Sequence, residues 1–284
     1  EDIKGALLDS AVQTLITPSS FTSPAIAVSS YNSLEISDEL YYAVFEPADD
    51  LAWKGNLKRY AISADGIVDA DGNPAVDSIT GFFSSDSRSY WSDSIDGNEV
   101  SEGGAAAQLS GSERQIFVIK SGVMHLFNPQ SSGYLSDTDL GLNLVDNVDD
   151  IQPRSGVSYR TELMNFIGGM NTDETPRKAM EDPLHSRPVV VNYNEGKQVV
   201  YVATNSGYLH AINTADGSEY FSLIPEEVLK NPNYFLSPEL ISDNRKVYGL
   251  DGNLSYWHND INLNGKVDGS DTVYLYLGMR RGGH

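Results

Sequence analysis

Two stretches of the sequence, Gln115-Ile-Phe-Val-Ile-Lys-Ser-Gly-Val-Met-His-Leu-Phe-Asn128 and Gln198-Val-Val-Tyr-Val-Ala-Thr-Asn-Ser-Gly-Tyr-Leu-His-Ala-Ile-Asn213, repeat one pattern. In each, a run rich in apolar residues leads into the motif Ser-Gly-x-x-His-x-x-Asn. A β-type run, a glycine turn and a second run are typical of a β-hairpin. We therefore expect both stretches to be hairpins that occupy equivalent positions in a repeated β structure.

The spacing of this repeat predicts a β-propeller. The two turn glycines, Gly122 and Gly207, are 85 residues apart, which is about two blades at the roughly 40 to 45 residues of a four-stranded blade. A weaker third copy combines Leu40–Phe45 with Gly55–Ile62. We expect a mainly β fold with propeller blades of the quinoprotein type and a ring that this chain leaves incomplete. A β-sandwich is the alternative, because short alternating strands also fit it.

The chain divides into an N-terminal segment and a β region. Apolar residues recur at helical spacing over 2–16 and a Ser/Thr/Pro-rich stretch follows, so we expect a helix and a linker over 1–24 and the propeller region over 25–284. The strands expected in the second region are Leu40–Phe45, Leu57–Ile62, Gln115–Ile119, Val123–Asn128, Val189–Tyr193, Gln198–Thr204, Tyr208–Asn213, Glu219–Ile224 and Thr272–Leu277.

Three other segments interrupt the strand pattern. Short helices are expected over 159–167 and 225–230. The stretch 63–112 is rich in Ser, Gly and Asp and has few apolar runs, so we expect it to form surface loops. On this interpretation, deletion of 84–100 should leave the melting temperature almost unchanged.

Composition restricts the function classes. The chain has 40 acidic and 19 basic side chains, and its net charge of −21 disfavours nucleic acid and anionic membranes as partners. The absence of cysteine excludes disulfides, thiolate metal sites and a cysteine nucleophile. No apolar run is long enough to cross a bilayer, so we expect no membrane insertion. The chain begins inside an amphipathic pattern and ends just after a strand-like run, and we expect it to be a segment of a longer protein.

The sharpest local motif is Asp260-Ile-Asn-Leu-Asn-Gly-Lys-Val-Asp-Gly-Ser-Asp271, which fits the twelve-residue calcium loop. Alternate side chains of such a loop converge on one point, Gly265 at position 6 allows the turn, and Val267 at position 8 anchors the loop. The predicted Ca²⁺ ligands, at positions 1, 3, 5, 7, 9 and 12, are Asp260, Asn262, Asn264, the Lys266 carbonyl, Asp268 and Asp271.

Two features qualify this match. The loop resembles that of dockerin-type modules more than that of calmodulin, because position 12 is Asp, and a strand-like run, Thr272–Leu277, replaces the helix that should follow. The alternative is a metal-free turn rich in Asx and Gly. Asp65–Asn73 begins in a similar way but departs from the spacing after three ligands, so turn chemistry explains it better.

Other candidate residues have simpler structural explanations. His125 and His210 occupy equivalent repeat positions, which favours the same packing role in both copies. Asp182-Pro-Leu-His-Ser-Arg-Pro188 brings together an acid, a histidine and a serine, but adjacency in sequence does not make a triad, and its prolines favour a rigid loop. Trp53 and Trp91 flank loops and are candidates for stacking on a carbohydrate or a protein. The chain contains no sequence motif for hydrolysis or phosphoryl transfer.

Segments spread over nearly the whole chain resemble the C-terminal propeller region of the type IV pilus tip-associated assembly factors and adhesins of the PilC/PilY type. The segments that carry the resemblance are Tyr41–Phe45, Trp53–Tyr60, Asp69–Val76, Gly81–Phe83 with Trp91, Gly103–Ala106, Asp182–Pro188, Tyr201–Asn213 and Tyr274–Gly278.

The resemblance implies a non-enzymatic protein at the pilus tip, on the cell surface and reached through the periplasm or outer membrane. It implies a role in pilus biogenesis, in the control of retraction and twitching motility, and in adhesion to host or abiotic surfaces, with pilins or minor pilins as partners. It also implies that a calcium loop, here Asp260–Asp271, regulates the balance of extension and retraction. The alternative function is a PQQ-dependent dehydrogenase, whose propellers use similar hairpins and also bind calcium.

Overall fold

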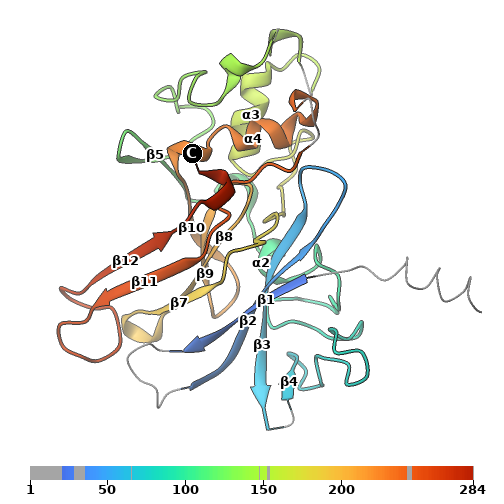
Figure 1. Ribbon diagram of the computed structural model, residues 1–284, viewed down its shortest axis with the longest axis vertical. Coiled ribbons are helices and arrows are strands. Elements are labelled where there is room, and N and C mark those ends of the chain that lie inside the picture. The colour runs from blue at the N-terminus through green and yellow to red at the C-terminus, as the bar shows by residue number, and fades with distance from the viewer. Residues whose placement is uncertain are drawn as a thin grey trace, which may run out of the picture.

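The computed structural model describes residues 21–28, 36–64, 66–146, 148–151, 154–241 and 245–283. The helix expected over 2–16 lies outside these residues. The fold is mainly β, as predicted, and its described strands form sheets of four, six and two strands (Figure 1). No helix in the described part of the chain has the length and apolar character needed to span a membrane.

The six-stranded sheet contains both copies of the repeat. Its order is β6-β5-β10-β9-β8-β7, with β5 over Ile116–Lys120, β6 over Val123–Leu126, β7 over Val189–Asn192, β8 over Gln198–Ala203, β9 over Leu209–Asn213 and β10 over Glu219–Ile224. Strands β7 to β10 form an antiparallel meander, and β10 then pairs in parallel with β5, with Ser222 opposite Ile116. The two hairpins predicted around Gly122 and Gly207 are confirmed.

The spacing of about two blades between the hairpins predicts that they belong to different blades, and this prediction is wrong. Hairpin β5–β6 joins the free edge of β10, so both copies lie in one sheet. The local motif specifies each hairpin, but it carries no information about which strand the hairpin joins. Among the described residues, no sheet closes into the ring of a propeller.

The four-stranded sheet packs on one face of the six-stranded sheet. It consists, in order, of β1 over Phe21–Val28, β2 over Ile36–Glu46, β3 over Lys54–Ser63 and β4 over Gly66–Val68. Its Tyr41 and Leu57 share one core cluster with Val200, Val202 and Ile212 of β8 and β9. The hairpin predicted from the third repeat copy is confirmed as β2–β3. The expected linker over 1–24 is wrong at its end, because β1 begins at Phe21 and pairs with β2.

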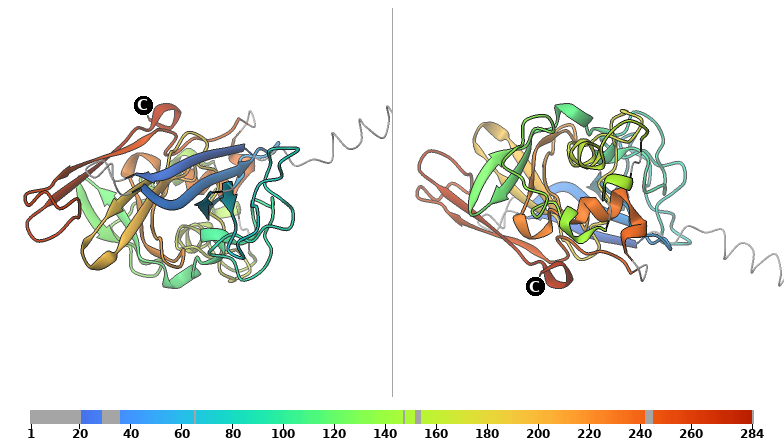
Figure 2. Two further views of the ribbon diagram at one scale, coloured as in Figure 1. Left: turned by 90° about the horizontal axis from the view of Figure 1, so that it is seen from below. Right: turned by 90° about the horizontal axis from the view of Figure 1, so that it is seen from above.

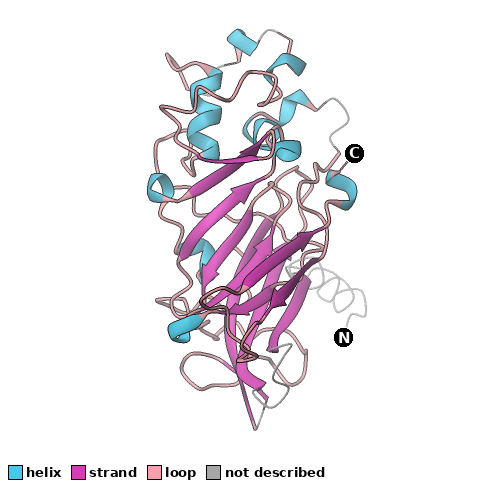
Figure 3. Ribbon diagram, turned by 90° about the vertical axis from the view of Figure 1, so that its left-hand side faces the viewer, coloured by secondary structure: helices cyan, strands magenta, loops and turns pink. Residues whose placement is uncertain are grey.

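The opposite face of the six-stranded sheet is covered by helices and by the two-stranded sheet. Helix α3 over Tyr159–Ile167, as predicted, and α4 over Asn231–Leu236 gather at one end of the molecule (Figures 1 and 3). The hairpin of β11, over Leu254–Asn259, and β12, over Thr272–Leu277, projects from one side (Figure 2). Strand β12 was predicted, whereas β11 was not.

The remaining helical elements are short. Pro225–Lys230, expected to be a helix, contains only a single 3₁₀ turn. The other described helix is α2 over Gly104–Ala107, and the 3₁₀ turns are η1 over Gly111–Glu113, η2 over Leu142–Leu144, η3 over Val148–Asp150, η4 over Asn194–Gly196, η5 over Glu226–Val228, η6 over Pro238–Leu240 and η7 over Arg280–Gly282.

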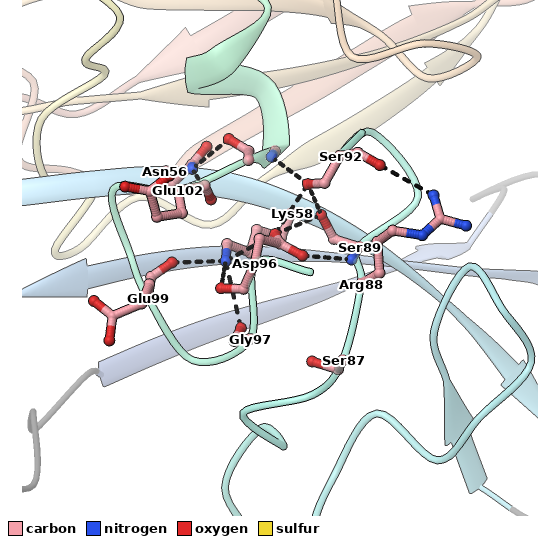
Figure 4. A network of polar contacts seen from close by, with 12 residues as sticks. Asn56, Lys58, Ser87, Arg88, Ser89, Ser92, Asp96, Gly97, Glu99 and Glu102 are labelled. Atoms are coloured by element: carbon pink, nitrogen blue, oxygen red, sulfur yellow. Dashed lines mark hydrogen bonds and ion pairs between the residues drawn. The ribbon is translucent and has the colours of Figure 1, made fainter. Parts of the chain in front are cut away.

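Part of the stretch 63–112 is buried, so its interpretation as surface loops alone is wrong. The reason is a polar core around Lys58 of β3, in which the Lys58 ammonium lies 2.9 Å from the Asp96 carboxylate with only 3% and 2% of the two side chains exposed (Figure 4). Lys58 Nζ also donates to the carbonyl of Glu99 at 2.7 Å, and Asp96 accepts from the amide and hydroxyl of Ser89 at 2.7 and 2.8 Å. Segment 84–100 therefore surrounds the buried ammonium group of Lys58.

Asn56, also on β3, fixes the next part of the same segment. Its side-chain amide donates to the carbonyls of Val100 and Gly103 at 3.0 and 2.9 Å, and its carbonyl oxygen accepts from the amide of Ala106 at 2.9 Å. Buried polar groups are stable only when they are hydrogen-bonded, and here the loop backbone supplies the partners. Deletion of 84–100 should therefore unfold the protein rather than leave it stable.

A point substitution tests this polar core. Asp96→Ala should lower the free energy of unfolding by roughly 3–5 kcal/mol, because it leaves the Lys58 ammonium buried without its counter-ion. Asp71→Ala is the matched control, since it removes the partner of Arg88 in an exposed ion pair and should shift the urea midpoint far less. Equal midpoints for the two variants would contradict the assignment of 84–100 to the core.

Candidate metal centre

The predicted calcium loop connects β11 to β12 at the tip of their hairpin. The cross-strand pair of Asn259 and Thr272 closes its base, and Asp260 directly after β11 is buried. Gly265 has a φ of 74°, in the left-handed region that glycine adopts without strain, so the expected role of position 6 is confirmed. All six predicted ligand residues therefore lie on one tightly folded loop.

The two carboxylates at the ends of the loop fix its backbone. Asp260 accepts hydrogen bonds from the amides of Asn264 at 3.2 Å and Gly265 at 2.7 Å, which are the fifth and sixth positions. Asp271 accepts from the amides of Ile261 and Asp268, each at 3.0 Å. The Ile261 amide, followed by that of Asp268, holds the pKa of the Asp271 carboxyl below its usual range. Asp271 is consequently ionised at neutral pH.

The side chains in the middle of the loop contact one another. The amide groups of Asn262 and Asn264 donate to the two carboxylate oxygens of Asp268 at 3.1 and 2.7 Å. The oxygen of Asn264 accepts from the amide of Lys266 at 2.7 Å, which orients the peptide plane next to the predicted carbonyl ligand. Carboxylate and amide oxygens are the donors that suit a hard cation such as Ca²⁺.

A histidine that the sequence interpretation missed completes the cluster. One ligand atom from each of His258, Asp260 and Asp271 lies within 4.8 Å of the others, and His258 Nε2 is 3.5 Å from Asp271 Oδ2. His258 precedes the twelve-residue template, so a search for the loop does not find it. The signal was the period of two along a strand, which places residues 258 and 260 on the same face.

Val267 anchors the loop to the body of the protein, as its position 8 predicts. Its amide donates to the carbonyl of Asn192 at 2.8 Å, and its carbonyl accepts from the amide of Asn194 at 3.1 Å. These bonds form an isolated parallel bridge between Val267 and Tyr193, just beyond β7. The loop is therefore joined to the edge of the six-stranded sheet as well as to its own hairpin.

The other histidines do not share one role, so the expectation of the same packing in both repeat copies is wrong. His125 on the edge strand β6 stacks on Tyr134, with ring centroids 4.5 Å apart. His210 on the central strand β9 is buried, with Nδ1 2.7 Å from Glu219 Oε1. Burial lowers the pKa of His210. The difference follows from the position of each strand in the sheet.

The segment Asp182–Pro188 forms no catalytic triad. Asp182 pairs with Lys246, whereas His185 lies 2.6 Å from Asp251. Ser186 is buried, and its hydroxyl accepts from the amide of Ala203 at 3.0 Å. The acid, the histidine and the serine thus have separate partners, which supports a structural role for this segment.

Trp53, Trp91 and the Asp-rich turn at Asp69 also have structural contacts within the fold. Trp91 is buried and donates to the carbonyl of Thr214 at 3.0 Å, while the ring of Trp53 lies 4.1 Å from the Lys246 ammonium. Asp69 accepts from the amides of Asp71 and Asn73, as expected for a turn.

Compared with known proteins, the chain matches no protein-family model, no curated protein and no solved structure.

The buried carboxylate beside His210 gives a testable pH dependence. Burial alone would raise the pKa of Glu219, but Arg114 and His210 outweigh burial and lower it from 4.5 to about 2. Because the pKa of Glu219 is lower in the folded protein than in the unfolded chain, its ionised carboxylate stabilises the fold at pH values above the unfolded-state pKa of 4.5. This contribution is lost as the pH falls from 4.5 towards 2. Glu219→Gln should flatten the loss of melting temperature over this range.

Glu227→Gln is the control, because Glu227 is exposed. It should keep the acid dependence of the wild-type protein. An unchanged dependence in Glu219→Gln would show that other carboxylates cause the acid sensitivity.

Proposed function

We propose that the loop Asp260–Asp271 binds one Ca²⁺ and that this chain is a non-enzymatic, calcium-binding module. The observation that carries the proposal is that the carboxylates of Asp260 and Asp271 lie together at the hairpin tip. The side chains of Asn262 and Asn264 contact Asp268 in the same loop. Asp260, Asn262, Asn264, the Lys266 carbonyl, Asp268 and Asp271 would hold the ion. The NH₂ groups of Asn262 and Asn264 now donate to Asp268. Rotation of both side-chain amides would put their oxygens in these positions, where they could bind the ion.

The donor set favours calcium over a transition metal. Three of the proposed ligands are carboxylates, two are amide oxygens and one is a backbone carbonyl, and oxygen donors of this kind suit Ca²⁺. His258 is the single nitrogen in the cluster, and its 3.5 Å contact with Asp271 suits a neighbour that orients a ligand.

We further propose that the module belongs to a type IV pilus tip-associated protein of the PilC/PilY type. In this role it would promote pilus biogenesis, control retraction and contribute to surface adhesion. The resemblance of segments along the chain supports this proposal, together with a structured hairpin loop of calcium type. The antiparallel meander of β7 to β10 has the strand order of one four-stranded propeller blade, and we propose that it is one.

Calcium should stabilise the protein. For a loop with two neutral Asn ligands we expect a dissociation constant of roughly 10⁻⁶–10⁻⁴ M, and even the weak end gives about 2 kcal/mol of stabilisation at about 2 mM calcium. The measurement is the melting temperature in EGTA and in calcium, with calorimetric titration of Ca²⁺. Asp260→Ala should abolish both effects, and Asp93→Ala, which changes an exposed acid outside the loop, should keep them.

In cells, Asp260→Ala should disturb pilus extension or retraction while the protein stays folded. The readouts are pilus number by microscopy and twitching on agar, with Asp93→Ala again as the control. Normal piliation and motility in Asp260→Ala would refute the proposed regulatory role, whether or not the loop binds calcium.

The purified protein should show no oxidation of alcohols or sugars when PQQ and calcium are supplied. The expectation rests on the missing cysteine, since quinoprotein dehydrogenases commonly stack PQQ on an adjacent cysteine pair. A titration of PQQ monitored by absorbance, with a dye-linked oxidation assay, tests it. Stoichiometric binding with turnover would favour the dehydrogenase instead.

A further inference from the structure

A pocket of about 450 Å³ opens directly beside the candidate metal loop. Its walls are mainly aromatic and aliphatic side chains from β8, β10 and the segment after β7, closed on one side by the loop itself: Tyr193, Val199, Tyr201, Tyr220, Phe221 and Val267. The volume lies within the roughly 300–1,000 Å³ of pockets that bind small molecules or side chains. None of the roles proposed above uses this pocket.

The wall chemistry favours an aromatic group as the ligand. The hydroxyls of Tyr193 and Tyr201 lie 2.7 Å apart and bond to each other, so they are satisfied without a ligand. Phe221 already takes part in edge-to-face ring contacts with Phe117 at 6.1 Å and with Tyr201 at 6.4 Å. Another ring can extend this edge-to-face arrangement. Tyr220, 41% exposed, leaves part of the aromatic wall open to solvent.

The charges around the pocket favour a neutral ligand. Its rim carries one carboxylate and one ammonium, Glu195 and Lys197, whose charged atoms are 3.9 Å apart and cancel. The net charge of −21 on the whole chain disfavours an anionic ligand, and the balanced pair places no net negative charge at the rim to attract a cation. The complementary group is therefore an uncharged ring, such as a tyrosine or tryptophan side chain.

Val267 couples this pocket to the metal loop. It lines the pocket and is also position 8 of the loop, between the proposed ligands Lys266 and Asp268. Its backbone is hydrogen-bonded to Asn192 and Asn194, the residues on either side of Tyr193, which is another wall residue. A cation that fixes the loop backbone would thus fix two walls of the pocket at the same time.

We propose that this pocket binds a neutral aromatic side chain of a partner polypeptide and that calcium in the loop strengthens this binding. The coupling rests on the calcium binding proposed above, whereas the pocket stands on its own geometry. Because coupling between two sites is reciprocal, an occupied pocket also strengthens calcium binding.

The test uses p-cresol and 3-methylindole, the side chains of tyrosine and tryptophan, as probes. Titration of the ¹⁵N-labelled protein with each probe, in EGTA and in saturating calcium, gives site-specific dissociation constants from the amide shifts around Tyr193 and Phe221. We expect saturable binding that is at least about fivefold tighter in calcium, at the lower end of ordinary coupling between sites.

Three variants separate the parts of the proposal. Tyr220→Ala removes a pocket wall and should weaken probe binding severalfold while calcium binding stays normal. Val267→Ala keeps every proposed calcium ligand but should reduce the coupling. Tyr274→Ala is the control, since it removes an exposed aromatic ring on β12 that does not line the pocket.

Each outcome decides a different part. If calcium binds by calorimetry but leaves the probe affinity unchanged, the coupling is wrong and the calcium site stands. If calcium does not bind, the proposed function and the coupling both fail, and the probe titration still decides the pocket. Absence of saturable shifts with either probe, or binding of tetramethylammonium in their place, would overturn the assignment of a neutral aromatic ligand.

Discussion

The buried ion pair of Arg114 and Glu219 is the interaction on which the six-stranded sheet depends. Only 1% and 4% of these side chains are exposed, and placing charges in such a site costs several kcal/mol per ion unless their hydrogen bonds are satisfied. The guanidinium meets that condition with bonds of 2.7 and 3.0 Å to the two carboxylate oxygens, and His210 bonds to one of the same oxygens. The partners are 105 residues apart in sequence, so the pair is satisfied only when β5 lies beside β10.

This constraint explains which part of the fold could be predicted. A hairpin is encoded by neighbours in the chain, and the glycines at 122 and 207 with their flanking apolar runs were sufficient to predict both copies. The arrangement of those hairpins is not local. Arg114 lies just before the first copy of the motif and Glu219 beyond the second, so the repeat pattern contains neither member of the pair that joins β5 to β10.

The stretch around 84–106 could not be predicted for a different physical reason. Its Ser, Asp and Gly residues suggest a solvated loop, but the side chains that it surrounds, Lys58 and Asn56, are polar and require oxygen and amide partners. The number of apolar residues in a segment predicts only an apolar core, and the core at this point is polar. The turn at Gly265 could be predicted because the twelve positions of the loop template are consecutive, whereas the contact of the loop with Tyr193 depends on where the hairpin docks.

The position of the loop also determines what a bound cation can affect. A two-stranded hairpin is marginal by itself, and β11–β12 is held by its inner side chains, such as Leu275 and Leu277, and by Val267. Within the loop, the Asn262 and Asn264 amides already offset the charge of Asp268. A cation must replace these two hydrogen bonds, so its net binding energy is the difference between coordination and the bonds that it displaces. Asn262 and Asn264 precede Val267 by five and three residues, and Val267 is bonded to the sheet edge beside Tyr193, so a rotation of these two side chains would take place close to that edge.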